Sequence, residues 1–107
     1  MKFGIILGTK EPEKAWNAFR FGVTALIANH EVKVFLINKG VELEEAKNEK
    51  YDVKKQLDSF IENKGQILAC GTCLKSRQKK GSKVCLISTM AELLKLVEDS
   101  DKLLTFG

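Results

Sequence analysis

Short apolar runs alternate along this chain with longer segments in which apolar residues recur every three or four positions. The short runs have the length of single β-strands and lie at 3–7, 32–37, 67–70, 84–87 and 102–106. Strands that are largely apolar and separated by helices are typical of a parallel sheet covered on both faces. The alternation predicts an α/β fold: a three-layer α/β/α sandwich with a five-stranded parallel sheet, flavodoxin-like in kind, with right-handed crossovers.

The first helix is expected over residues 12–29, with Pro12 in its first turn, where a missing N–H does no harm. Its large apolar residues recur at helical spacing and are expected to form the core face: Trp16, Phe19, Val23, Leu26 and Ile27. A second stripe consists of small residues that would let the helix lie close to the sheet: Ala15, Ala18, Gly22 and Ala25.

Three further helices are expected. One covers 53–64 and ends at Gly65, and a short one covers 73–80 and ends at Gly81. A third begins at Thr89, which has a glutamate three residues later, the spacing of a capping box.

The chain has 107 residues, of which 44% are hydrophobic and 30% charged, so a single domain over 1–107 is expected. Its apolar runs are far shorter than the roughly 18 to 20 residues that span a bilayer, and no signal peptide is recognisable. We therefore expect a cytoplasmic protein without a membrane partner. The net charge of +4 is mild and aromatic residues do not interleave with the basic ones, so nucleic acid is not an expected partner. Gly8-Thr9-Lys10 lacks the glycine-rich pattern of a phosphate loop, and no cofactor is expected.

Two of the three cysteines stand in Cys70-Gly71-Thr72-Cys73, where a predicted strand meets a predicted helix. In a parallel sheet the loops after the strands share one edge, and sites form there where the strand order reverses. Free N–H groups at a helix start favour a thiolate. No acidic residue occurs from 70 to 83, and the basic residues in that stretch are Lys75, Arg77, Lys79, Lys80 and Lys83. This pattern predicts Cys70 as a reactive thiol, with Lys75 and Arg77 stabilising the thiolate or docking a partner.

Three chemistries could use the cysteine pair. Disulfide exchange of the thioredoxin type is weakened because Pro12 is the one proline of the chain and lies outside the motif. Zinc is disfavoured because structural zinc needs four ligands, and the chain offers three cysteines and His30 without a second pair; no metal is expected. A persulfide carrier needs an accessible thiolate, nearby cations and a flexible loop. Cys85, between two aliphatic residues, is expected to be a buried core residue.

Four segments resemble, in order and spacing, those of a known family. They are residues 11–18, the second strand with its following Gly-Val at 30–42, the cysteine segment 68–77 and the closing strand 99–106. Together they resemble the DsrE-like family of sulfur-relay proteins, in particular its small single-domain members. The resemblance implies a five-stranded parallel α/β/α fold, sulfur transfer through a cysteine, and assembly into trimers or hexamers.

In the sulfur-relay members the cysteine ends the third strand and stands seven residues before an arginine, as Cys70 and Arg77 do here. The resemblance therefore implies that Cys70 accepts the sulfur, while Cys73 lies outside the relay pattern. Our leading hypothesis is a cytosolic sulfur carrier or sulfurtransferase-like homo-oligomer, with Cys70 as persulfide bearer, Cys73 as auxiliary thiol, and protein donors and acceptors of sulfur. The alternatives are a non-catalytic assembly module that kept the fold, and a redox sensor using a Cys70–Cys73 disulfide.

Overall fold

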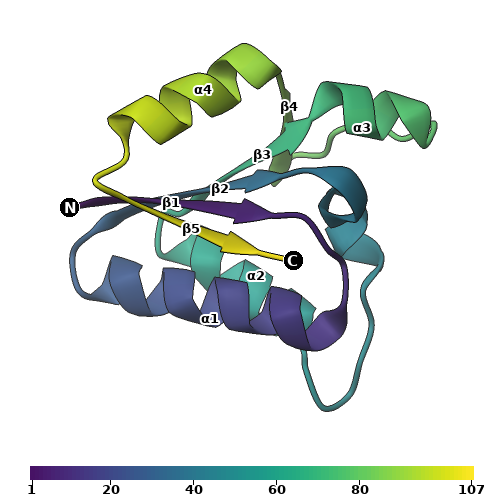
Figure 1. Ribbon diagram of the computed structural model, residues 1–107. Coiled ribbons are helices and arrows are strands. Elements are labelled where there is room, and N and C mark those ends of the chain that lie inside the picture. Colours follow the sequence, from purple (N-terminus) through teal and green to yellow (C-terminus); the bar gives the residue numbers. More distant parts are fainter.

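The computed structural model describes residues 1–107 and contains one sheet of five strands. The strands are β1 (Lys2–Leu7), β2 (Glu31–Leu36), β3 (Gln66–Cys70), β4 (Cys85–Ser88) and β5 (Lys102–Phe106). All four pairings are parallel, and the order across the sheet is β4-β3-β2-β1-β5 (Figure 1). The chain adds strands on one side of β1 as far as β4 and then crosses back to the other side for β5.

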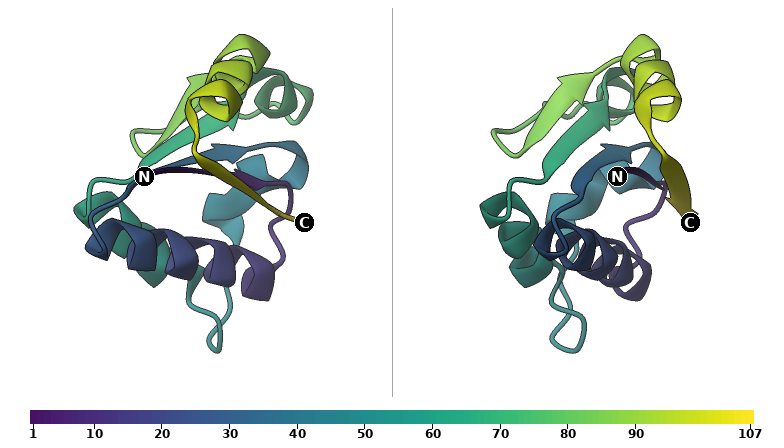
Figure 2. Two further views of the ribbon diagram at one scale, coloured as in Figure 1. Left: turned by 60° about the vertical axis from the view of Figure 1, so that its left-hand side comes forward. Right: turned by 90° about the vertical axis from the view of Figure 1, so that its left-hand side faces the viewer.

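Helices cover both faces of this sheet. α1 (Pro12–Ile27) and α2 (Val53–Glu62) lie side by side on one face, and α4 (Met90–Asp99) lies on the other (Figures 1 and 2). α3 (Gly71–Ser76) continues from the end of β3, and a 3₁₀ segment, η1 (Asn38–Glu45), follows β2. The predicted three-layer sandwich with a five-stranded parallel sheet is confirmed. None of the helices is long and apolar enough to cross a membrane.

α1 packs on the sheet through its small residues. The predicted small stripe is buried together with Phe19, and a Cβ on Gly22 would lie 2.8 Å from the ring of Phe60 in α2. The large residues follow the prediction only in part, because Trp16, Val23 and Leu26 are half-buried. The expectation that Ile27 belongs to the core face is wrong, since it is 66% exposed. Close approach through the small stripe leaves larger residues at the margins of the contact.

Three helices are followed by a non-glycine residue in the left-handed region. The backbone N–H of the residue after it donates a hydrogen bond to a carbonyl oxygen in the last turn of the helix. These residues are Asn29, Lys64 and Gln78, with φ angles of 70°, 72° and 54°. In α3 the Lys79 N–H donates to the Leu74 carbonyl at 2.9 Å. This turn ends the helix at Ser76. The expectation that the helix runs to 80 and stops at Gly81 is wrong.

The face under α4 is covered less completely than the face under α1 and α2. Thr89 caps α4 as expected, because its Oγ1 accepts a hydrogen bond from the Glu92 N–H at 3.2 Å. Leu96 of this helix is buried against the sheet. The outer apolar surface, as we call it, consists of exposed apolar residues of α4 and of the two edge strands: Leu86, Met90, Leu94, Val97 and Leu103.

Candidate functional site at the carboxyl edge of the sheet

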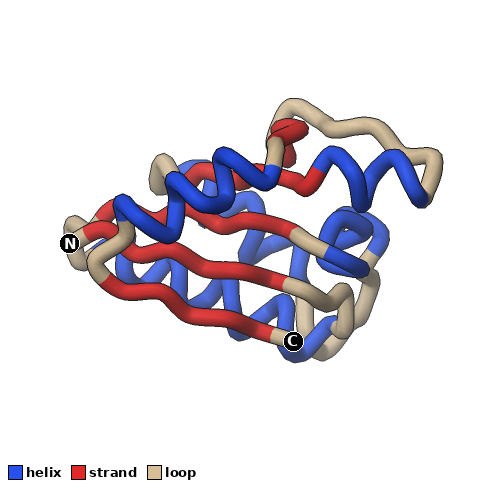
Figure 3. Tube along the Cα trace, turned by 45° about the horizontal axis from the view of Figure 1, so that its top comes forward, coloured by secondary structure: helices blue, strands red, loops and turns tan.

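Because every strand is parallel, the loops after β1, β2, β3 and β4 open at one edge of the sheet (Figure 3). Cys70 is the last residue of β3, and it pairs in register with Ser88, the last residue of β4. The strand order reverses between β1 and β5, whereas β3 lies between β2 and β4. The expectation that the site lies at the reversal is therefore wrong for the cysteine segment, although the carboxyl edge itself was predicted correctly.

Cys70 joins β3 to α3. Its Sγ accepts a hydrogen bond from the Cys73 N–H at 3.4 Å, so the thiol caps the first turn of α3. Cys70 is 4% exposed, because α3 begins at the very next residue and the strand end is enclosed. The expected accessible thiol is thus covered in this conformation.

Cys73 is the more exposed thiol of the pair. Its Sγ accepts a hydrogen bond from the backbone N–H of Asn38 at 3.3 Å, which ties α3 to the start of η1. Burial raises the pKa of the Cys73 thiol, and the adjacent Cys70 thiol raises it further, whereas the Asn38 N–H and the Arg77 guanidinium act in the opposite direction. All three cysteines are free thiols.

Arg77 lies beside a carboxylate that we did not single out from the sequence. Its Nε is 3.1 Å from Oε2 of Glu42, and its Nη1 donates to the carbonyl oxygen of Cys73 at 3.2 Å. Glu42 also pairs with Lys10 Nζ at 3.3 Å. Burial on its own raises the pKa of Glu42, but the hydrogen bonds and charges of Lys10 and Arg77 outweigh it and hold that pKa below its usual value. Glu42 thus joins the loop after β1, η1 and the end of α3.

Two further contacts connect η1 to the segment that follows α3. Lys79 forms an ion pair with Glu45, and the Ser82 Oγ donates to Glu44 Oε1 at 2.8 Å. The basic stretch is free of acids in sequence, but in space it faces the acids of η1. The signal that could have found these acids is the topology: segments after β2 and β3 must meet at one edge.

An open groove lies on another side of α3, which we call the lysine groove. Its walls include Lys75 of α3, Lys79 and Lys80 just after this helix, and Ile87 and Met90 around the end of β4. No acidic residue lines it. Gly71 and Ser88 also line it, so it passes next to Cys70. Of the two cations predicted from sequence, Lys75 reaches this groove and Arg77 does not.

Cys85 lies in β4, apart from Cys70 and Cys73, and is 5% exposed. Its N–H donates to Ser82 Oγ at 3.0 Å. Burial raises the pKa of the Cys85 thiol to about 12, and the nearby Glu44 carboxylate adds to the effect. The expectation that Cys85 is a buried core residue agrees with this placement.

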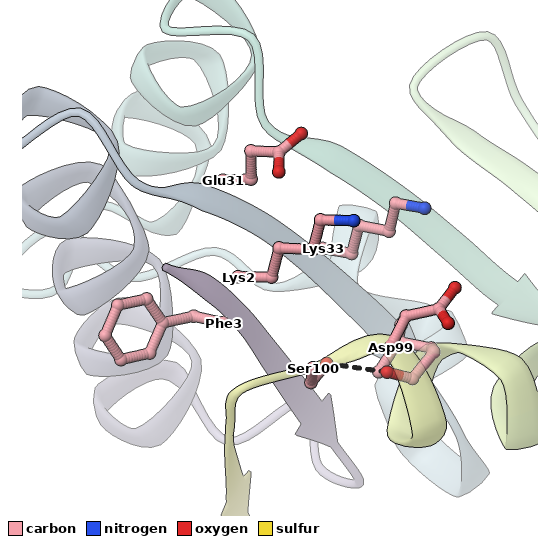
Figure 4. A pocket seen from close by; sticks show the side chains of 7 residues that line it. Lys2, Phe3, Glu31, Lys33, Asp99 and Ser100 are labelled. Carbon is pink, nitrogen blue, oxygen red and sulfur yellow. Dashed lines mark hydrogen bonds between the residues drawn. The ribbon is translucent and has the colours of Figure 1, made fainter.

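The opposite edge of the sheet has a hollow of its own, between the starts of β1 and β2 and the end of α4 (Figure 4). Lys2, Lys33, Glu31 and Asp99 line it, so charges of both signs meet there, and no cysteine is among its lining residues. Nearby, the Nδ1 of His30 lies 2.9 Å from the N-terminal amine. The imidazole therefore contacts the N-terminus. No three His, Cys, Asp or Glu side chains converge in a way that could hold a metal ion.

The fold and the carboxyl edge of the sheet define a small parallel α/β protein with a free Cys-x-x-Cys pair that begins at the end of its third strand. The family model of the DsrE/DsrF-like family matches residues 1–106. The chain belongs to this family, which is of the sulfur-relay type.

Two archaeal proteins and two solved structures are similar to the chain. The uncharacterized protein MJ0989 of Methanocaldococcus jannaschii is 33% identical over 99% of this chain and 100% of its own length. The uncharacterized protein MK0008 of Methanopyrus kandleri is 34% identical over 88% of this chain and 83% of its own length. The crystal structure of the YchN protein from E. coli superposes with a TM-score of 0.82 at 21% identity, covering 99% of this chain and 100% of that one. A conserved protein of unknown function, BT1422 from Bacteroides thetaiotaomicron, gives a TM-score of 0.76 at 15% identity over 97% and 93% of the two chains. These structures share the fold.

Proposed function

We propose that the protein is a cytoplasmic sulfur carrier in which Cys70 accepts and passes on a sulfane sulfur. In the loading step the Cys70 thiolate attacks the outer sulfur of a donor persulfide, R–S–SH. The donor S–S bond breaks, the donor leaves as the thiolate R–S⁻, and Cys70 becomes Cys70–S–SH. Unloading repeats the exchange toward an acceptor thiolate, so no external oxidant or reductant is needed.

The observation that carries this proposal is the place of Cys70 in the fold of a chain that belongs to a sulfur-relay family. It ends β3 at the carboxyl edge, and its sulfur accepts the Cys73 N–H at the start of α3. Cys73, the more exposed thiol, stands within one helical turn and would resolve or relay the sulfur.

The lysine groove supports protein partners as donors and acceptors. Its open shape and its lining of lysines and apolar residues without an acid suit an acidic segment of polypeptide. Lys75 is exposed in this groove and is in our proposal the docking cation. Arg77 acts through Glu42 and the Cys73 carbonyl by holding the end of α3. Because Cys70 is covered, transfer requires α3 or the start of α4 to move.

The proposal is tested by incubating the reduced protein with a persulfide donor and mapping the adducts by mass spectrometry. Wild-type protein should gain about 32 Da on Cys70, the mass of one sulfur atom, and Cys70→Ser should abolish that adduct. Cys85→Ser is the matched control and should load normally, because Cys85 is buried elsewhere. Wild-type protein that stays unmodified under several donors, or that loads on Cys73 alone, contradicts the proposal.

A redox sensor is the second candidate, because Cys70 and Cys73 are both free and joined by the N–H to Sγ contact of 3.4 Å. In that function the pair would form a disulfide reversibly. A measurable reduction potential that Cys73→Ser removes would support it. A pair that stays reduced in glutathione buffers of oxidising poise would exclude it.

We also propose that the protein is a homo-oligomer, a trimer or hexamer. The outer apolar surface supports this, because Met90, Leu94 and Val97 are exposed and stand four and three residues apart on α4, which places them on one face of the helix. Exposed apolar groups of this kind mark interaction surfaces. Light scattering during gel filtration measures the mass. Leu94→Glu should lower the oligomer mass, whereas Ile27→Glu, on the opposite helix layer, should not. An oligomer that forms without any sulfur loading of Cys70 would favour the non-catalytic assembly module.

A further inference from the structure

Ser88 carries a buried hydroxyl that has no hydrogen-bond partner. It is 4% exposed, and its Oγ is the buried side-chain polar atom that the protein leaves unsatisfied. Leaving a buried hydroxyl unpaired is unfavourable. Native proteins pair most such groups, so an exception calls for a physical reason.

The hydroxyl lies beside Cys70. Ser88 and Cys70 are registered neighbours at the ends of β4 and β3, and adjacent strands lie about 4.8 Å apart. Registered residues of neighbouring parallel strands point to the same face, so the two side chains share the α4 face. The Cys70 Sγ already accepts the Cys73 N–H, and it does not reach the Ser88 hydroxyl in this state.

We propose that Ser88 is a positioning residue whose hydroxyl donates a hydrogen bond to the outer sulfur of a Cys70 persulfide. This inference rests on the proposed function. An S–S bond of about 2.05 Å extends the Cys70 side chain by one atom, and that atom can meet a neighbour that the thiol itself does not reach. The outer sulfur carries the negative charge of the persulfide, and a hydroxyl that donates to it lowers its pKa. Ser88 thus holds the sulfur in its charged form, and loading supplies the partner that the empty protein lacks.

The test compares wild type, Ser88→Ala and the control Ser82→Ala in the full chain. Ser82 is a suitable control because its hydroxyl already donates to Glu44 and accepts the Cys85 N–H. Each protein is loaded with inorganic polysulfide, and the rate at which iodoacetamide caps the Cys70 persulfide is followed against pH by mass spectrometry. The midpoint of this profile should rise by about one pH unit in Ser88→Ala, the size expected for a lost charge-assisted hydrogen bond. In Ser82→Ala it should stay at the wild-type value.

Thermal unfolding of the unloaded proteins distinguishes a positioning role of Ser88 from a purely structural one. Ser88→Ala should unfold at the wild-type temperature or above it, because it removes an unpaired hydroxyl, whereas Ser82→Ala should unfold lower. A wild-type profile in Ser88→Ala overturns the role of Ser88 and leaves the sulfur-carrier function standing. Ser88→Ala that is destabilised or unfolded also overturns it, because the hydroxyl then has a structural partner. Wild-type protein that takes up no sulfur overturns the proposed function and this inference with it.

Discussion

Cys85 is a titratable group inside the core, so the stability of the fold should depend on pH through its thiol. Its pKa is about 12 in the folded protein against a usual value of 9.0. A raised pKa means that the fold favours the protonated thiol, so this contribution is fully present below pH 9 and is lost as the pH rises toward 12. At about pH 10.5 the unfolded chain has released this proton and the folded protein has not, and the loss amounts to about 2 kcal/mol.

The assay is urea unfolding under reducing conditions, at about pH 8 and about pH 10.5, for wild type and Cys85→Ala. The variant loses core packing at both pH values, but it has no thiol to titrate. All other side chains are the same in the two proteins, so their contributions cancel in the comparison. The stability advantage of wild type should therefore shrink by about 2 kcal/mol between the two pH values. An advantage that is constant within about 0.5 kcal/mol would refute the reasoning, because it would mean that the Cys85 thiol ionises as readily in the fold as in the unfolded chain.

Three further outcomes follow from the packing around the site. Leu74→Ala should lower the free energy of unfolding, measured in urea, by about 2–4 kcal/mol, because Leu74 is the buried residue of α3. The control Ile27→Ala, at an exposed position, should change it by less than about 0.5 kcal/mol. Equal effects of the two substitutions would contradict the assigned burial. Gly40→Ala should lower the free energy of unfolding more than Leu74→Ala or Ile27→Ala does, because the added Cβ would lie against the carbonyl oxygen of Leu7 at the end of β1. A wild-type melting temperature in Gly40→Ala would show that η1 is free to shift. Glu42→Gln should speed alkylation of Cys73 at neutral pH about two- to fivefold. The substitution leaves the Arg77 guanidinium without its carboxylate partner, and the unneutralised charge lowers the pKa of the Cys73 thiol. An unchanged rate would show that this ion pair has no influence on the thiol.

Much of the fold could be predicted from local patterns. Apolar runs and helical periodicity depend on residues close in sequence, and all five strands and the four helices were found from them. Helix ends were less predictable. Gly81 was the expected stop for α3, but the turn uses Gln78 in the left-handed region. Nothing in the local pattern distinguishes that residue, because the helix end is decided by the hydrogen bond from the Lys79 N–H to the Leu74 carbonyl.

The candidate site was predicted in part. Cys70, Cys73 and Lys75 come from one continuous segment, so the sequence brings them together directly. Glu42 is 35 residues from Arg77, and only the parallel pairing of β2 and β3 places the two segments at one edge. Ser88 was missed for the same reason, since a serine after an apolar strand carries no signal until its registered neighbour is known to be Cys70.

The sequence by itself determined the alternation of strands and helices, the position of the Cys-x-x-Cys segment at a strand end and the burial of Cys85. These features follow from side-chain hydrophobicity and spacing, which are local properties. The tertiary structure alone decided that Cys70 is covered, that the acids of η1 neutralise part of the basic segment, and that an unpaired hydroxyl lies beside the thiol. Each of these depends on which strands are neighbours in the sheet, and strand order is set by the free energy of the whole core and not by any one segment.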